Sequence, residues 1–150
     1  MKYGLALASL CVVVFSSACS KSPQRLLADA NRYHQEKKYR EASILYQKVI
    51  AKDRTNAEAY YREGLNLMDM QDPVNAIKYL RRAVDLRPDN LDADSKLAEL
   101  ELAVYSANPK KLSSFLVDAR ELTTKILQQQ PDSFDGLRLQ GLIDLADNNP

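Results

Sequence analysis

The sequence predicts an all-α fold, an array of helical hairpins that follows an N-terminal leader. Helix breakers recur in an ordered way, small residues recur every 34 positions, and no run of alternating apolar and polar residues indicates a strand. Asp72-Pro73, Asn108-Pro109 and Asn149-Pro150 each place a capping side chain before proline. Proline suits the first helical position because the N–H that it lacks would have no intrahelical partner there. We therefore expect a helix to begin at each of these three prolines.

The remaining junctions indicate where the other helices begin. Pro88-Asp89-Asn90 and Pro131-Asp132-Ser133 end one helix and cap the next. Thr55 followed by Glu58 forms a candidate capping box at the equivalent earlier junction. The pattern predicts alternating helices of about four turns, joined by tight turns.

The leader, residues 1–18, has the organisation of a secretory signal: Lys2 supplies one charge, and about a dozen uncharged, mostly apolar residues follow it. This run is shorter than the ~20 residues that span a bilayer. Ser16-Ser17-Ala18-Cys19 resembles a bacterial lipobox. The resemblance implies cleavage before Cys19, lipid on its thiol, and a short tether over residues 19–22. An ordinary signal peptide with an incidental cysteine is the alternative.

Composition bounds the mature chain further. Without the leader, 20 Lys and Arg balance 20 Asp and Glu, which argues against a polybasic nucleic-acid surface. Cys11 leaves with the leader and Cys19 would carry lipid, so no disulfide can form within the mature chain. Ser20 follows the lipobox, where an inner-membrane retention signal is usually Asp, and this favours the outer membrane.

Small residues recur at Ala30, Gly64 and Ala98, and again at Ala42 and Ala76, with the same 34-residue spacing. They suit close helix crossings. The second repeat also carries Tyr60, Leu67, Leu80 and Pro88 at helical spacing. This pattern resembles that of the tetratricopeptide family, W-x2-L-G-x2-Y, then A-x3-F, then P.

The resemblance covers roughly residues 23–150 and implies a right-handed α-solenoid. Its expected repeats are 23–56, 57–90, 91–133 with an insertion, and an incomplete repeat at 134–150. The insertion would either lengthen the second helix of the third hairpin or add a separate turn near Pro109. Such an elongated hairpin would form a ridge around residues 106–118 for a specific partner, and a tolerated surface insertion is an equal alternative.

The end of the sequence departs from the pattern as well. Asn149-Pro150 has the form of a helix start, and a helix over 134–146 would expose Leu137, Gly141 and Leu145. Solenoids need polar terminal caps for solubility. We therefore expect the natural chain to continue, and the alternative is that this last helix is itself the cap.

Little in the sequence indicates catalysis. His34 is the single histidine, and no second His or Cys lies at metal-ligand spacing. Four glycines are too few to build a phosphate-binding loop, and no serine is placed to use His34 as a base. We expect no catalytic residue, no metal and no cofactor.

The positive expectation is protein binding. The resemblance implies that the first helix of each pair lines a concave groove. The candidate groove residues are Leu27, Asn31, His34, Glu58, Tyr61, Leu65, Met68, Asp69, Ser95, Glu99 and Leu102. Such a mixture suits an extended peptide or a partner helix. Packing of Tyr61 and Met68 against the neighbouring repeat is an equal alternative.

One known use of such grooves is disfavoured. Some family members bind a partner's C-terminal carboxylate with a basic clamp. Leu27 lies where that clamp would need a cation, and Asn31 alone is insufficient.

Together these features predict a non-enzymatic protein-interaction scaffold, a lipoprotein of a bacterial envelope that faces the periplasm. We expect a protein or peptide partner, membrane attachment through Cys19, and neither nucleic acid nor a small-molecule substrate. The combination is similar to repeat lipoproteins found with exosortase and exopolysaccharide export systems. The alternatives are a pilus or outer-membrane-protein assembly lipoprotein, and the recruiting arm of an enzyme whose catalytic domain lies beyond residue 150.

Overall fold

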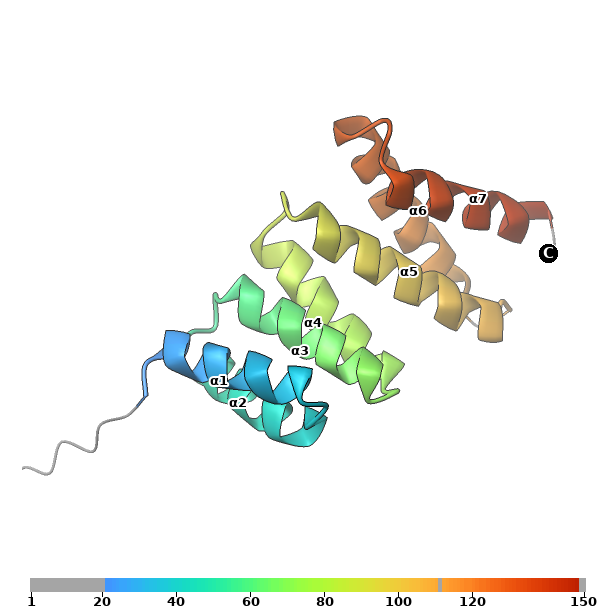
Figure 1. The fold of residues 1–150 in the computed structure, drawn as a ribbon. Coiled ribbons are helices and arrows are strands. Elements are labelled where there is room, and N and C mark those ends of the chain that lie inside the picture. Colours follow the sequence, from blue (N-terminus) through green and yellow to red (C-terminus); the bar gives the residue numbers. More distant parts are fainter. Residues whose placement is uncertain (1–20, 111, 149–150) are drawn as a thin grey trace, which may run out of the picture.

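The computed structural model describes residues 21–110 and 112–148, so Cys19, the leader and Asn149-Pro150 lie outside the described residues. Seven helices and no strand form this part of the chain, which confirms the all-α prediction (Figure 1). The helices are α1 (Pro23–Gln35), α2 (Tyr39–Lys52), α3 (Ala57–Asp69), α4 (Pro73–Leu86), α5 (Leu91–Ala107), α6 (Ser113–Gln129) and α7 (Phe134–Asn148).

Consecutive helices pack as hairpins, α1 with α2, α3 with α4 and α5 with α6. Each hairpin contacts the next, and α7 packs against both α5 and α6 (Figure 1). Because each repeat touches only its neighbours, the array is a solenoid without one central core. None of these helices has the length and apolar character that crossing a bilayer requires.

The starts of the first helices repeat in detail. Ser22, Asn56 and Asn90 lie 34 residues apart, and each side-chain oxygen accepts a hydrogen bond from the N–H three residues later, at 3.3, 3.0 and 3.3 Å. Each cap satisfies one N–H that the helix leaves unpaired. The predicted capping box of Thr55 and Glu58 is wrong, because Asn56 is the cap and Thr55 donates to Asp53 instead.

The turn between the two helices of a repeat explains why the third hairpin is longer. Lys37 and Gln71 end α1 and α3 with a φ of 59°, a left-handed conformation that closes the turn. The equivalent third-repeat residue, Tyr105, stays helical with its ring buried. The helix therefore continues, and α5 and α6 each have 17 residues against 13 in α3 and 14 in α4.

Asp72 caps α4 and Pro73 is its first residue, as predicted. The corresponding prediction at Asn108-Pro109 is wrong. Asn108 ends α5, and α6 begins only at Ser113. The extra residues thus lengthen both helices of the hairpin as well as the connection between them.

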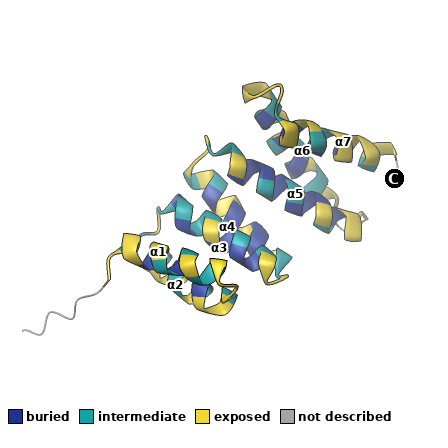
Figure 2. Ribbon diagram, in the orientation of Figure 1, coloured by how far each residue is buried: buried dark blue, intermediate teal, exposed yellow. Residues whose placement is uncertain are grey.

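The repeated small residues are buried where helices cross, as the spacing predicts. Ala30, Ala42, Ala76 and Ala98 are fully buried, and so is Gly64 within α3. Figure 2 shows more buried ribbon on α3, α4 and α5 than on α1 and α7 at the two ends. The middle of the array is therefore its best-packed part.

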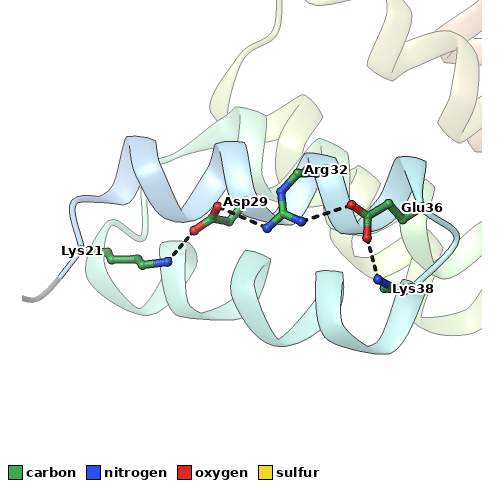
Figure 3. Close-up of polar contacts among 5 residues, drawn as sticks. All are labelled: Lys21, Asp29, Arg32, Glu36 and Lys38. Atoms are coloured by element: carbon green, nitrogen blue, oxygen red, sulfur yellow. Dashed lines mark hydrogen bonds and ion pairs between the residues drawn. The ribbon is translucent and has the colours of Figure 1, made fainter.

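The two ends differ in polarity. On α7, Leu137 is 55% exposed, Leu145 is 67% exposed, and Gly141 has open space around it, so the predicted exposed face is confirmed. On the outer side of α1, alternating charges form a line of ion pairs (Figure 3). Its members are Lys21, Asp29, Arg32, Glu36 and Lys38. One end of the solenoid is thus polar and the other is apolar.

Candidate functional site

The first helices of the hairpins carry the candidate groove. α1 contacts α3, and α5 contacts α7, so the groove positions of successive repeats face a common side. Two hollows open there among the described residues. One lies between α1 and α3 with a volume of about 140 Å³, and the other lies between α5 and α7 with a volume of about 550 Å³.

The larger hollow, here called the α5–α7 cleft, is mainly apolar in its side chains. Leu102 and Tyr105 are buried, whereas Leu142 is 41% exposed and Leu145 is available to solvent. Exposed leucines that line a concavity favour contact with another apolar surface. The full lining consists of Glu99, Leu102, Ala103, Tyr105, Ser106, Pro109, Arg138, Leu142, Leu145 and Ala146.

A chain of ion pairs crosses from α5 to α7 at this cleft. Lys96 binds Glu99 at 3.0 Å, Glu99 binds Arg138 at 3.5 Å, and Arg138 binds Asp135 at 3.6 Å. All four side chains are at least 33% exposed, so water screens these pairs. They can exchange partners with the polar groups of a bound segment at little cost.

The smaller hollow is polar, and its groups already bind one another. His34 Nε2 lies 2.8 Å from Asp69 Oδ2, which joins α1 to α3. Tyr46 donates its hydroxyl to Asn31 Oδ1 at 2.8 Å, and burial raises the pKa of Tyr46 to about 12. The residues that line it are Asn31, His34, Gln35, Tyr46, Arg62 and Leu65. Its size and its internal hydrogen bonds leave little room for a partner side chain.

The structure separates the predicted groove residues into groups. Asn31, His34 and Leu65 line the small hollow, with Asp69 bonded to His34, and Glu99 and Leu102 line the α5–α7 cleft.

The other predicted residues lie outside both hollows. Tyr61 and Met68 pack, partly buried, against the apolar cluster that joins the second and third repeats, and Leu27 packs within the first repeat. Ser95 is only 5% exposed. Glu58 binds Arg62 at 2.7 Å on the same helix.

The sequence reading missed the contribution of α7 to the groove. Arg138, Leu142 and Leu145 supply one wall of the cleft. Leu142 lies as far along α7 as Glu99 lies along α5, and the same holds for Leu145 and Leu102. This shared register was the signal in the sequence.

Three fully buried carboxyl groups, those of Glu63, Asp94 and Glu101, lie at the junctions between repeats. Glu63 of α3 accepts hydrogen bonds from Ser43 and Gln47 of α2, and burial raises its pKa. These contacts join the first repeat to the second.

The other two buried carboxyl groups form ion pairs with cations that are themselves partly exposed. Glu101 of α5 binds Arg81 of α4, which also binds Asp118 of α6. Burial raises the pKa of Glu101 to about 7, and Arg81 opposes that rise. Asp94 binds Lys125 of α6 at 2.6 Å, and its pKa is also raised by burial. Since each carboxyl binds a neighbouring helix, these groups fix how the helices are placed.

Across residues 21–110 and 112–148, no group of three or more His, Cys, Asp or Glu side chains is placed to hold a metal ion.

Comparisons with known proteins agree with this architecture. The family model described as "Tetratricopeptide repeat" matches residues 57–90, which comprise α3 and α4. No curated protein sequence matches the chain significantly.

Similar solved structures cover most of the chain. The first TPR of Spaghetti (RPAP3), bound to the HSP90 peptide SRMEEVD, is 20% identical with a TM-score of 0.72, over 85% of this chain and 94% of that one. The second TPR domain of human RPAP3, in complex with an HSP70 peptide, is 18% identical with a TM-score of 0.65, over 82% and 98%. MamA is 24% identical with a TM-score of 0.71, over 85% and 69%. Residues 57–90 therefore match a tetratricopeptide repeat, and the described part of the chain shares the fold of these solved tetratricopeptide-repeat domains.

Proposed function

We propose that this protein is a non-catalytic scaffold that binds a protein partner in the α5–α7 cleft. Two similar tetratricopeptide domains are bound to peptides of HSP90 and HSP70, which supports peptide binding as the use of such a groove. Because this chain is only 20% and 18% identical to these two domains, they support the mode of binding but do not indicate the partner.

The cleft itself carries the proposal. Its volume of about 550 Å³ accommodates several side chains, and Leu142 and Leu145 present apolar surface within it. Burial of apolar surface contributes roughly 25 cal/mol per Å², so two covered leucines would add a few kcal/mol to binding. The ion pair between Glu99 and Arg138 supplies polar partners at the edge. The expected ligand is an apolar segment with at least one polar flank.

The acidic C-terminal peptides seen with the two neighbours are not the proposed ligand. Leu27 replaces the cation of a carboxylate clamp, and its side chain packs within the first repeat. Asn31 Oδ1 already accepts a hydrogen bond from the hydroxyl of Tyr46. Of the side chains that line the small hollow, Arg62 already binds Glu58 and His34 already binds Asp69.

We further propose that Cys19 anchors the scaffold to a bacterial membrane, facing the periplasm, with the outer membrane favoured. The lipobox-like Ser16-Ser17-Ala18-Cys19 supports this location. The combined architecture supports a role in envelope export, of exopolysaccharide or of sorted proteins. A Cys19→Ser chain should move from the membrane fraction to the soluble fraction, and membrane retention of the unprocessed chain would point to another anchor.

Co-purification tests the cleft. Full-length Leu142→Asp should lose the partner that the unmodified chain retains from detergent-solubilised envelopes, because a carboxylate replaces apolar contact surface. Leu137→Asp is the matched control, since Leu137 is also an exposed leucine of α7 but does not line the cleft. Equal partner recovery with both variants would refute this use of the cleft.

A further inference from the structure

The balanced charge of the mature chain conceals a strong division along its length. Residues 19–54 contain nine Lys and Arg and four Asp and Glu, a net charge of +5. Residues 55–150 contain 11 Lys and Arg and 16 Asp and Glu, a net charge of −5. The first repeat is therefore basic and the rest of the array is acidic, an asymmetry typical of contact with a polyanion or a membrane.

Part of this positive charge gathers around one hollow at the N-terminal end of the array, here called the basic end. Lys21, Lys48 and Lys52 line it together with Leu26 and Leu45, and its volume is about 380 Å³. All three lysines are exposed. The hollow combines apolar side chains with cations, as surfaces that contact lipid headgroups do.

The neighbouring helix surface extends this character. Ile44 lies one turn before Lys48 on α2 and is 55% exposed. An exposed branched side chain beside a lysine suits the boundary between headgroups and acyl chains.

Nearby acidic groups do not cancel the charge. Asp29 binds Lys21 at 2.7 Å and Arg32 at 3.6 Å, while Glu36 binds Arg32 and Lys38 (Figure 3). The carboxylates of α1 are thus shared among more cations than they can neutralise.

On α2, Lys48 makes no ion pair within the described part of the chain. Asp53, just beyond the end of α2, accepts hydrogen bonds from the backbone and hydroxyl of Thr55, which hold the pKa of its carboxyl below the usual value. Its oxygens are therefore directed to the turn that precedes α3, and Lys48 keeps its positive charge.

The basic end also lies close to the proposed anchor. Only one residue separates Cys19 from Lys21, so their Cα atoms are at most about 7.6 Å apart, at ~3.8 Å per residue. This distance is shorter than the Debye length of ~10 Å at 0.1 M salt. A lipid on Cys19 would hold the basic end within electrostatic range of the headgroups.

From these observations we infer that the basic end docks on anionic phospholipid headgroups and orients the array on the membrane. The inference rests on the proposed lipid anchor at Cys19. The acidic residues 55–150 are repelled by the same surface, so the array projects away from it. The α5–α7 cleft, at the other end of the array (Figure 1), then remains accessible to a partner.

Lysine labelling on vesicles tests this orientation. The full-length protein, processed and acylated in cells, is reconstituted in pure phosphatidylcholine vesicles or in vesicles that also contain phosphatidylglycerol. Acetylation of each lysine is then followed by mass spectrometry. Labelling of Lys48 and Lys52 should slow several-fold in the anionic vesicles and recover in high salt. Lys78, an exposed lysine of α4, is the internal control and should label equally in both.

A paired variant sharpens the test. Lys48→Gln/Lys52→Gln should abolish the protection of Lys21, because each lysine near an anionic surface changes the docking equilibrium about fivefold. Lys78→Gln/Arg82→Gln removes the same charge from α4 and should leave that protection intact. Equal labelling of Lys48 in the two vesicle types, or equal protection of Lys78, would overturn the inference.

Vesicle flotation tests the lipid anchor at Cys19 separately from the docking of the basic end. The acylated chain should float with neutral vesicles even in high salt, which reports the lipid on Cys19 alone. A chain that fails to float with neutral vesicles lacks the anchor, whereas a chain that floats without protecting Lys48 has the anchor and no docked basic end.

Discussion

A methyl group on Gly64 would lie 2.7 Å from Cγ of Leu80, nearer than the ~3.5 Å at which carbon atoms pack. Leu80 is fully buried, and its backbone nitrogen would lie 3.3 Å from the same methyl. The side chain therefore has little freedom to move aside. This contact therefore sets how closely α3 and α4 approach each other in the second repeat.

Gly64→Ala should therefore destabilise the protein by about 1–3 kcal/mol through overpacking, although alanine favours a helix by ~1 kcal/mol. Gly141→Ala is the matched control, because no atom lies within 4 Å of its new methyl. That variant should be stabilised by up to ~1 kcal/mol. Urea unfolding of both variants measures the difference. A Gly64→Ala chain as stable as the Gly141→Ala chain would refute the close crossing.

The buried Glu101 should make the protein less stable as the pH rises. Its pKa is about 7 in the folded chain against an ordinary 4.5, because burial disfavours the charged form. The folded chain thus binds this proton more tightly than the unfolded chain. The resulting stability is fully present below pH 4.5 and is lost as the pH rises through about 7. Glu63 and Asp94 shift in the same direction.

Urea unfolding at several pH values checks this expectation. The loss due to Glu101 should be on the order of 3 kcal/mol. Glu101→Gln should reduce the pH dependence, and Arg81 would keep its partner Asp118. A variant with the pH dependence of the unmodified chain would show that Glu101 is not the responsible group.

The turn residue Gln71 should accept glycine with a gain in stability. Its φ of 59° is unfavourable for a residue with a Cβ and is free of strain for glycine. We expect Gln71→Gly to raise the free energy of unfolding by roughly 0.5–1 kcal/mol. Gln130→Gly is the control, because Gln130 ends α6 with a φ of −136° and should gain nothing. A loss of stability at position 71 would contradict the observed turn.

Tyr61 should contribute to stability as well as to any binding. Its ring packs, partly buried, against the apolar cluster between the second and third repeats. Tyr61→Ala should therefore cost about 1–2 kcal/mol, less than a fully buried aromatic residue. Thermal unfolding followed by circular dichroism measures it. An unchanged melting temperature would contradict this packing role and favour the predicted role of Tyr61 in the groove.

The first two repeats could be predicted well because local signals agree there. Small residues, capping side chains and a left-handed turn recur at one spacing, so the pattern of one hairpin predicts the next. At Asn56 the sequence signal was ambiguous, since Thr55 with Glu58 also matches a capping box. Asp53 decides which residue caps α3, because it binds Thr55 and leaves Asn56 as the cap.

The third hairpin and the cleft could not be predicted in the same way. Asn108-Pro109 matches a helix start locally, but burial of Tyr105 continues α5 past the usual turn. Likewise, the groove character of Leu142 depends on how α7 packs against α5, which is a tertiary contact. Local pattern therefore predicts which helices form, and packing determines which of their faces remain open.

The most direct test of the account is photo-crosslinking in the native envelope from a reactive residue at position 142, with captured partners identified by mass spectrometry. The same residue at position 117 is the control, because Val117 is 55% exposed on α6 and does not line the α5–α7 cleft. We predict a partner that is captured from position 142 and not from position 117. Capture of the same proteins from both positions, or of none from position 142, would contradict the proposal that the cleft binds a protein.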